Sequence, residues 1–215
     1  RRLVLDISQK ILSEITVYMK YARYLPADQR RETWEEMTTR NRDMHIENFP
    51  KLASEIESAY KLVYEKKVLP SMRSLQFAGP AIKQTPSRIY NCAYLPIDDY
   101  QAFSEVMFLL LGGTGVGYSV QRHHVDKLPS ITIPTKRRRY LVGDSIEGWS
   151  DCIKMLMKAY FCGRPEPEFD FSGVRPKGAL LVTSGGKAPG PEPLKDCVHN
   201  IKRILDRKEN GDQLS

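Results

Sequence analysis

The stretch from Pro70 to Pro129 decides the fold of this chain; it reads PSMRSLQFAGPAIKQTPSRIYNCAYLPIDDYQAFSEVMFLLLGGTGVGYSVQRHHVDKLP. Residues 88–97 are rich in aromatic and β-branched side chains, which predicts a strand. Residues 100–111 carry apolar side chains at helical spacing, and the glycines at 112–113 end that helix. Residues 116–120 predict a second strand. The stretch is therefore a strand–helix–strand unit, long enough for a parallel crossover.

The glycine run GGTGVG from Gly112 to Gly117 has the composition of a nucleotide-binding loop. A dinucleotide fingerprint lies between a strand and a following helix, whereas these glycines follow a helix and precede a strand. No Gly-Lys-Ser/Thr ends the run, so it is not a P-loop either. The residues alone favour a tight bend between helix and strand.

Three polar or thiol side chains flank the predicted helix. Cys92 lies in the middle of the first strand, where a cysteine is usually a small buried hydrophobe. Asp98 and Asp99 follow that strand, at the position of a helix N-cap.

Composition and charge set the class of protein. The chain has 215 residues, of which 41% are hydrophobic and 27% charged, as in a soluble globular protein of one domain or one and a half. No run of eighteen apolar residues or signal peptide is present, which predicts a cytoplasmic protein without membrane contact. The net charge of +7 favours anionic partners. The densest basic run, Lys136–Arg139, is either a loop or strand edge or a polyanion-binding patch.

The remaining cysteines are Cys152, Cys162 and Cys197. Their spacing matches neither a zinc site nor a CxxC redox motif, so we expect packing residues and no metal.

Elsewhere the periodicity is mostly helical, and no internal repeat is visible. A helix is expected over residues 3–25 and closed by Pro26, with two more from about Arg31 and over residues 51–67. Beyond Pro129, the sequence predicts a helix capped by Asp144, strands over 169–171 and 179–182, and a helix from Pro193 to about Lys208.

The loop SGGKAPGP, residues 184–191, permits two interpretations. Backbone N–H groups of Gly185 and Gly186, with Lys187, could cradle a phosphate ahead of the last helix. The alternative is a structural loop, because its prolines remove donors.

Several motifs agree on one family. NCAYLPI, the acidic pair and GGTGVGYSVQ resemble the catalytic subunit of ribonucleotide reductase, as do DSIEGW, FDFSGVRPKGA, GGKAPGPEPL and the leading KYARYLPADQRRETWEE. The likeness is strongest to the adenosylcobalamin-dependent (class II) type and related class I chains. It implies an α/β fold, with an N-terminal helical region at residues 1–69. Residues 70–215 would form the first part of a ten-stranded α/β barrel, incomplete in this chain.

The resemblance also implies radical removal of the ribose 2′-hydroxyl, with a cysteine pair that becomes a disulfide. Cys92 matches one member of that pair. The other residues that the resemblance assigns are Ser71, Asn91 and Gly113 near the substrate, Asp98, Asp99, Gln121 and Arg122 at the effector site, and Gly185, Gly186 and Lys187 near nucleotide.

The implied partners include a ribonucleoside di- or triphosphate, a dNTP or ATP effector, and a thioredoxin- or glutaredoxin-type reductant. The radical would come from adenosylcobalamin, bound mainly outside this chain, or from a metal-radical subunit. The thiyl-forming cysteine, the second redox cysteine and the acid/base glutamate would lie in a C-terminal part, and we expect an oligomer. Two alternatives stay open: a noncatalytic nucleotide-binding or regulatory module that keeps the effector site, and a basic nucleic-acid-binding protein.

Overall fold

The computed structural model describes residues 2–181 and 185–214, with side chains from residue 7 onward. The contacts divide the chain into two compact units, Arg1–Tyr90 and Asn91–Ser215. The domain boundary expected after residue 69 stays a prediction.

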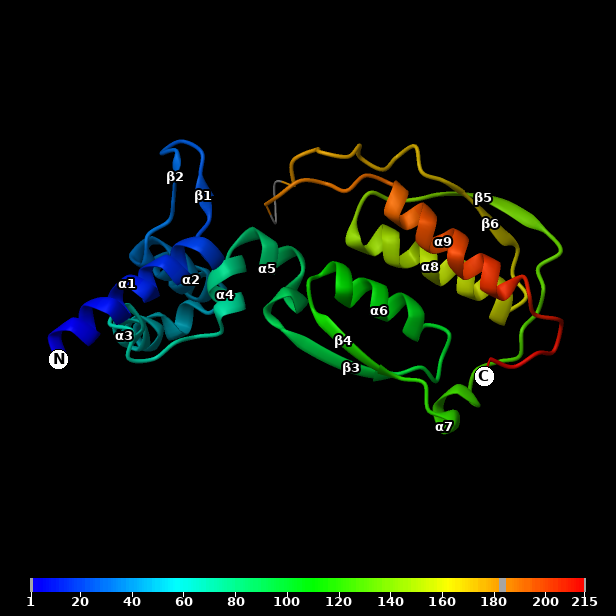
Figure 1. Cartoon of the computed structure of the whole chain (residues 1–215), viewed down its shortest axis with the longest axis horizontal. Helices are drawn as coiled ribbons and strands as arrows, with labels where there is room; N and C mark the ends of the chain where they lie inside the picture. The colour runs from blue at the N-terminus through cyan, green and yellow to red at the C-terminus, as the bar shows by residue number, and fades with distance from the viewer. Residues whose placement is uncertain (1, 182–184, 215) are drawn as a thin grey trace. The chain divides into compact units, whose positions relative to one another are not determined.

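The first unit is helical, apart from one short hairpin (Figure 1). Its strands β1 (Tyr24–Leu25) and β2 (Arg30–Arg31) pair antiparallel. A capping box begins α2: Thr33 Oγ1 accepts from the N–H of Glu36, and the Glu36 carboxylate accepts from the N–H of Thr33. The helices are α1 (Arg2–Lys20), α2 (Trp34–Asn48), α3 (Ala53–Tyr64), α4 (Met72–Phe77) and α5 (Pro80–Gln84), with 3-10 turns at Pro50–Leu52 and Pro86–Ile89.

The first helix is shorter than the sequence predicts. It ends at Lys20, and residues 24–25 belong to the hairpin. The N–H of Glu32 donates to the Arg23 carbonyl at 2.8 Å, and the Glu32 carboxylate accepts from the N–H of Arg23 at 3.1 Å. This pairing uses the backbone groups that a longer helix would need.

A buried polar network joins the helices of the first unit. The Asn41 side-chain amide donates to the carbonyl of Ser74 at 3.1 Å and to its hydroxyl at 2.8 Å. The Tyr60 hydroxyl donates to Asn41 Oδ1. Because Asn41 is fully buried, these bonds fix the contacts of α2 with α3 and α4.

The second unit begins with the predicted strand–helix–strand element. Strand β3 (Cys92–Pro96) pairs in parallel with β4 (Gly115–Ser119), and α6 (Ala102–Leu111) connects them. The first strand starts later than expected, because Pro86–Ile89 form a 3-10 turn before it. The parallel crossover is therefore confirmed.

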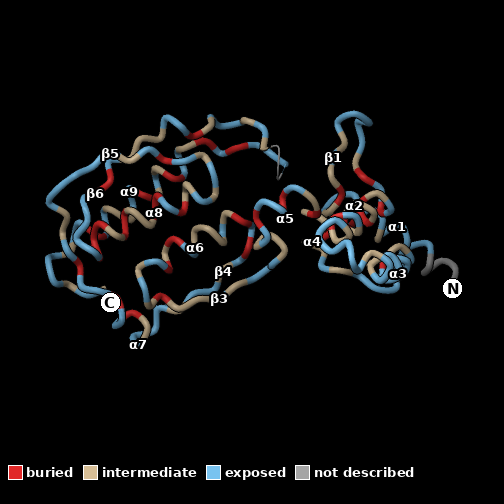
Figure 2. Tube along the Cα trace, turned by 180° about the vertical axis from the view of Figure 1, so that it is seen from behind, coloured by how far each residue is buried: buried red, intermediate tan, exposed pale blue. Residues whose placement is uncertain are grey.

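A second parallel strand–helix–strand element follows, although the sequence shows no visible repeat. Strand β5 (Arg137–Leu141) pairs with β6 (Glu166–Asp170) through α8 (Ile146–Phe161). Helix α9 (Glu192–Leu205) packs on α8, and α8 packs on α6 (Figure 1). Figure 2 shows the buried residues gathered along these helices; the large buried side chains there include Ile153, Leu156, Met157, Tyr160 and Leu194.

Three expectations for this half need correction. Helix α8 is capped by Ser145, whose hydroxyl accepts from the N–H of Gly148, because the Asp144 carboxylate pairs with Arg175 at 2.7 Å. The strand expected over residues 169–171 covers Glu166–Asp170 instead. Residues 179–181 make an isolated bridge, Leu180 with Lys187, rather than a strand; Val182 lies outside the described residues.

The α/β class is confirmed, whereas the ten-stranded barrel stays a prediction. Within residues 2–181 and 185–214 the strands form three two-stranded sheets, none of them closed. In the described helices, no stretch has the length and apolar character needed to cross a membrane.

Candidate functional site

The register of β3 and β4 positions Cys92 at the start of the parallel pair. Cys92 lies opposite Gly115, and the N–H of Gly115 donates to the carbonyl of Asn91 at 2.9 Å. The cysteine is exposed. The expectation of a small buried hydrophobe is therefore wrong, because the pleat turns this side chain away from the core.

Burial alternates along β3. Ala93 and Leu95 are half-buried, and Leu95 packs on the core of the second unit. Cys92 and Tyr94 point to the other face and are exposed, Tyr94 at 66%. We call this face, with Gly115 and Gly117 opposite them in register, the open face.

The glycines of GGTGVG have different roles. Gly113 has φ of +90°, a left-handed conformation that an L side chain rarely adopts, and it forms the bend after α6. Gly115 and Gly117 have ordinary backbone angles, and added Cβ atoms would lie 3.5 Å and 3.9 Å from their nearest neighbours. The bend interpretation holds for Gly113, but it does not explain the glycines on the open face.

The predicted substrate residues are distributed over both units. Asn91 and Gly113 are exposed in the second unit, near the ends of β3 and β4 that carry Cys92. Ser71 is exposed in the first unit, at the N-cap position of α4. Its relation to Cys92 stays a prediction.

The predicted effector residues follow the carboxyl ends of β3 and β4. Because parallel strands end at the same edge, Asp98, Asp99, Gln121 and Arg122 all lie toward that edge. The Asp98 carboxylate accepts from Lys127 Nζ at 3.4 Å, a cation that the sequence interpretation missed.

Asp99 and Gln121 have local structural roles as well. Asp99 Oδ1 accepts from the N–H of Gln101 at 2.8 Å, which forms the turn before α6. Gln121 is the N-cap residue of α7 (Arg122–Val125), with no cap bond from its side chain. In the described residues, no hydrogen bond or ion pair links the two acids to Gln121 or Arg122.

The basic run forms β5 and faces carboxylates on β6. Arg137 lies 3.3 Å from a Glu166 oxygen, and Arg139 forms an ion pair with Asp170. The Arg139 guanidinium holds the pKa of that carboxyl well below its usual range. The strand-edge interpretation is confirmed, because β5 pairs on one side only in the described part of the chain.

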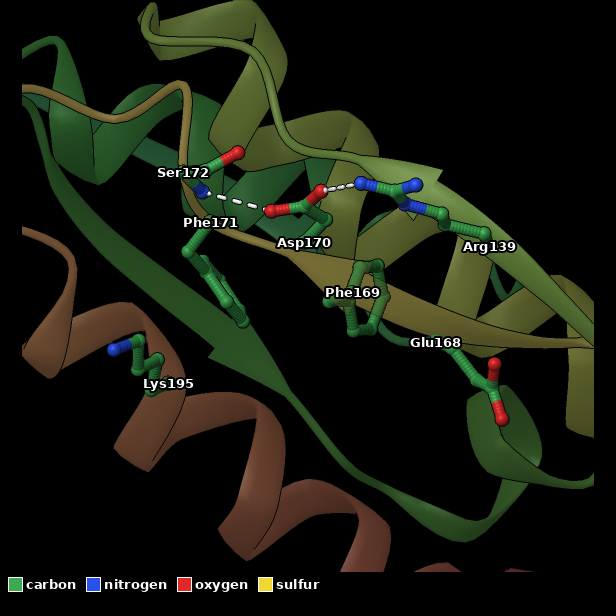
Figure 3. A pocket seen from close by; sticks show the side chains of 7 residues that line it. All are labelled: Arg139, Glu168, Phe169, Asp170, Phe171, Ser172 and Lys195. Carbon is green, nitrogen blue, oxygen red and sulfur yellow. Dashed lines mark hydrogen bonds and ion pairs between the residues drawn. The ribbon is translucent and has the colours of Figure 1, made fainter.

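A surface concavity of about 500 Å³ lies beside this pair (Figure 3). Phe169 and Phe171 line it with Glu168, while Arg139 is engaged by Asp170. Lys195 Nζ pairs with Glu192 at 2.8 Å and lies 5.7 Å from the centre of the Phe171 ring. Both cations that line the concavity, Arg139 and Lys195, are therefore already paired with carboxylates. The concavity does not favour a phosphate.

The glycine loop before α9 uses its own backbone donors. The N–H of Gly185 donates to the carbonyl of Leu181 at 2.8 Å, and the N–H of Leu181 donates to Gly186 at 3.0 Å. Lys187 is exposed. These bonds support the structural-loop interpretation, while nucleotide proximity stays a prediction; Ser184 lies outside the described residues.

The other thiols have mixed environments. Cys152 is fully buried, and burial raises the pKa of its thiol to about 12. Cys197 is half-buried, whereas Cys162 is exposed, which corrects the packing role expected for it. No group of three or more metal-ligating side chains occurs among the described residues.

Comparison with known proteins identifies the family. The chain is 31% identical over 157 residues to the adenosylcobalamin-dependent ribonucleoside-triphosphate reductase of Euglena gracilis, covering 69% of this chain and 22% of that protein. It is 26% identical over 270 residues to the enzyme so named from Lactobacillus leichmannii, covering 93% of this chain and 36% of that relative. No protein-family profile matches.

The fold matches the crystal structure of a B-12 dependent (class II) ribonucleotide reductase, with a TM-score of 0.78 and 24% identity. The match covers 94% of this chain and 38% of the other. The chain thus spans between 22% and 38% of these relatives.

The chain therefore belongs to the ribonucleotide reductase family, and the resemblance in its motifs is confirmed. More narrowly, it is an N-terminal portion of a catalytic chain, and these relatives are of the adenosylcobalamin-dependent type.

Proposed function

We propose that this chain is part of the catalytic chain of a ribonucleotide reductase and supplies one redox-active cysteine, Cys92. The observation that carries the proposal is the exposed thiol of Cys92 on the open face, within a chain related to named reductases. Residues outside this chain would complete the site, since the relatives are about three times as long.

The proposed reaction is a two-electron reduction. The carbon–oxygen bond at the ribose 2′ position breaks, and the hydroxyl leaves as water. Cys92 and a second thiol supply two electrons and two protons and become a disulfide, which an external dithiol then reduces. A thiyl radical elsewhere in the catalytic chain would begin the reaction by abstracting the 3′-hydrogen.

An exposed position suits both demands on Cys92. The thiol must contact the substrate, and it must exchange with a reductant after turnover. Cys152 meets neither demand, because it is fully buried and its pKa is raised to about 12.

The relatives' names support a ribonucleoside triphosphate substrate and adenosylcobalamin as the cofactor. None of the steps assigned to this chain requires contact with the cofactor.

The acids after β3 support a regulatory role. We propose that Asp98 and Asp99, with Gln121 and Arg122, contribute to a site for a dNTP or ATP effector. Cys92 starts β3, and these acids follow its end at Pro96, four residues or about 13 Å along the strand. Strand β3 therefore has the proposed substrate site at its start and the proposed effector site after its end.

The experiment uses the full-length catalytic chain that contains these residues. We expect deoxyribonucleotide formation from ribonucleoside triphosphate with adenosylcobalamin and a dithiol, and loss of multiple turnover in Cys92→Ser. Cys162→Ser is a matched control, because Cys162 is also exposed. The contrary result is a folded chain that binds effector but forms no product, whether adenosylcobalamin, a metal-radical subunit or neither is added. That result would contradict the proposal and indicate a regulatory module.

A further inference from the structure

Tyr94 shares the open face with Cys92 and has no structural task in the described unit. Its side chain is 66% exposed. In the described part of the chain it makes no hydrogen bond and no aromatic contact, unlike Tyr60 in the first unit. An exposed aromatic ring that makes no internal contact of this kind, on a strand beside an exposed thiol, is available to bind a ligand.

The glycine opposite Tyr94 leaves room beside the ring. Gly117 is the register partner of Tyr94, and a Cβ at Gly117 would lie 3.9 Å from Tyr94 Cδ2. Glycine weakens a strand, yet neither the backbone angle nor crowding requires it here. The same holds for Gly115 opposite Cys92. On the open face, β4 therefore places no side chain opposite Cys92 or Tyr94.

The spacing along β3 fits one nucleoside. Cys92 and Tyr94 are two residues apart, so their side chains stand about 6.6 Å apart on the same face. That separation is on the scale of a ribose and its own base. A ribose held at the Cys92 thiol therefore brings its base to the Tyr94 ring.

We propose that Tyr94 binds the substrate by stacking on the base of the ribonucleotide whose ribose faces Cys92, over the side-chain-free positions Gly115 and Gly117. This inference rests on the proposed function of Cys92. Since every base has a π-face, stacking supports all four ribonucleotides rather than selecting one.

The test compares variants of the full-length catalytic chain. For Tyr94→Leu we expect KM to rise about tenfold for all four ribonucleoside triphosphates, with kcat nearly unchanged. Losing one base–aromatic stacking contact weakens binding by about this factor. Tyr94→Phe keeps the ring and stays near wild type. Gly117→Ala should also raise KM, because the added methyl group lies beside the Tyr94 ring. Tyr118→Leu is the control, because Tyr118 is 61% exposed but lies in register with Leu95, on the other face.

A second readout does not depend on turnover. Ribonucleoside triphosphate should protect Cys92 from alkylation in wild type, and Tyr94→Leu should need about tenfold more nucleotide for the same protection. Equal KM and equal protection in Tyr94→Leu and wild type, or a change for one base only, would overturn the inference. If protection depends on Tyr94 but no product forms, the role of Tyr94 in binding is supported and the reductase activity is rejected. Neither protection nor product in wild type would overturn both.

Discussion

Arg139 and Asp170 form an ion pair across the parallel strands β5 and β6. Arg137 pairs with Glu166 in the same way, whereas Arg138 lies opposite Pro167. The densest basic run of the sequence therefore faces a row of carboxylates on the neighbouring strand. Two of its four cations, Arg137 and Arg139, are therefore paired within the second unit.

This compensation predicts weak binding to nucleic acid. We expect duplex DNA to bind no more tightly than about 10⁻⁴ M at physiological salt, the weak end of nonspecific binding. Arg138→Ala should change that affinity little. Titrations at several salt concentrations measure this affinity. A slope of about −4 or steeper in the logarithm of the binding constant against the logarithm of the salt concentration, made shallower by Arg138→Ala, would support a nucleic-acid-binding protein instead.

Gly148 and Gly117 should respond oppositely to alanine. A Cβ at Gly148 would lie 2.3 Å from the Gly143 carbonyl oxygen, so backbone must shift. We expect Gly148→Ala to lower the free energy of unfolding by about 1–3 kcal/mol. Gly117→Ala should raise it by about 0.5–1 kcal/mol, because the site has room and glycine costs entropy. Urea unfolding of the second unit, followed through Trp149, measures both; a stable Gly148→Ala would contradict the close approach.

The buried thiol predicts selective alkylation and a loss of stability at high pH. At pH 8, iodoacetamide should modify Cys92 and Cys162 but leave Cys152 unmodified, because thiolate is the reactive form. Burial raises the folded-state pKa of Cys152 to about 12, above its unfolded value. The stabilising contribution is therefore complete below about pH 8.5 and is lost as the pH rises toward 12.

Urea midpoints at pH 8 and pH 10.5 measure this loss. Cys152→Ala is the matched variant, and its midpoint should fall less between the two pH values. Rapid modification of Cys152 in the folded chain would contradict its burial.

The polar network of the first unit should be costly to cut. Asn41→Ala leaves the Tyr60 hydroxyl and the Ser74 backbone carbonyl without their bonds to Asn41. We expect a loss of about 2–3 kcal/mol in the free energy of unfolding, measured through Trp34 fluorescence. The control Asn48→Ala, at an exposed position, should change it by less than about 0.5 kcal/mol. Equal effects of the two would contradict the network.

The sequence predicted the strand–helix–strand element because its signals are local. Glycines end α6, and apolar periodicity marks the helix itself. The β1–β2 hairpin was missed because Glu32, nine residues beyond Arg23, provides the pairing. The cap of α8 was misplaced because Arg175, far along the chain, engages Asp144. Such contacts between distant residues leave no periodic signal.

The site was predicted unevenly for the same reason. Motif resemblance selected Cys92, but its exposure depends on which face of β3 meets the core. The alternation CAYLP could have indicated Tyr94, since residues two apart share a face. Lys127 could not be found this way, because its pairing with Asp98 depends on the path of the chain after β4.

The most direct test of the central claim is the oxidation state of Cys92 after one turnover. The full-length catalytic chain is given adenosylcobalamin and ribonucleoside triphosphate without an external reductant, then alkylated under denaturing conditions and mapped by mass spectrometry. We predict about one deoxyribonucleotide per chain, with Cys92 in a disulfide and Cys152, Cys162 and Cys197 still alkylated as free thiols. Product formed while Cys92 remains a free thiol would contradict the account.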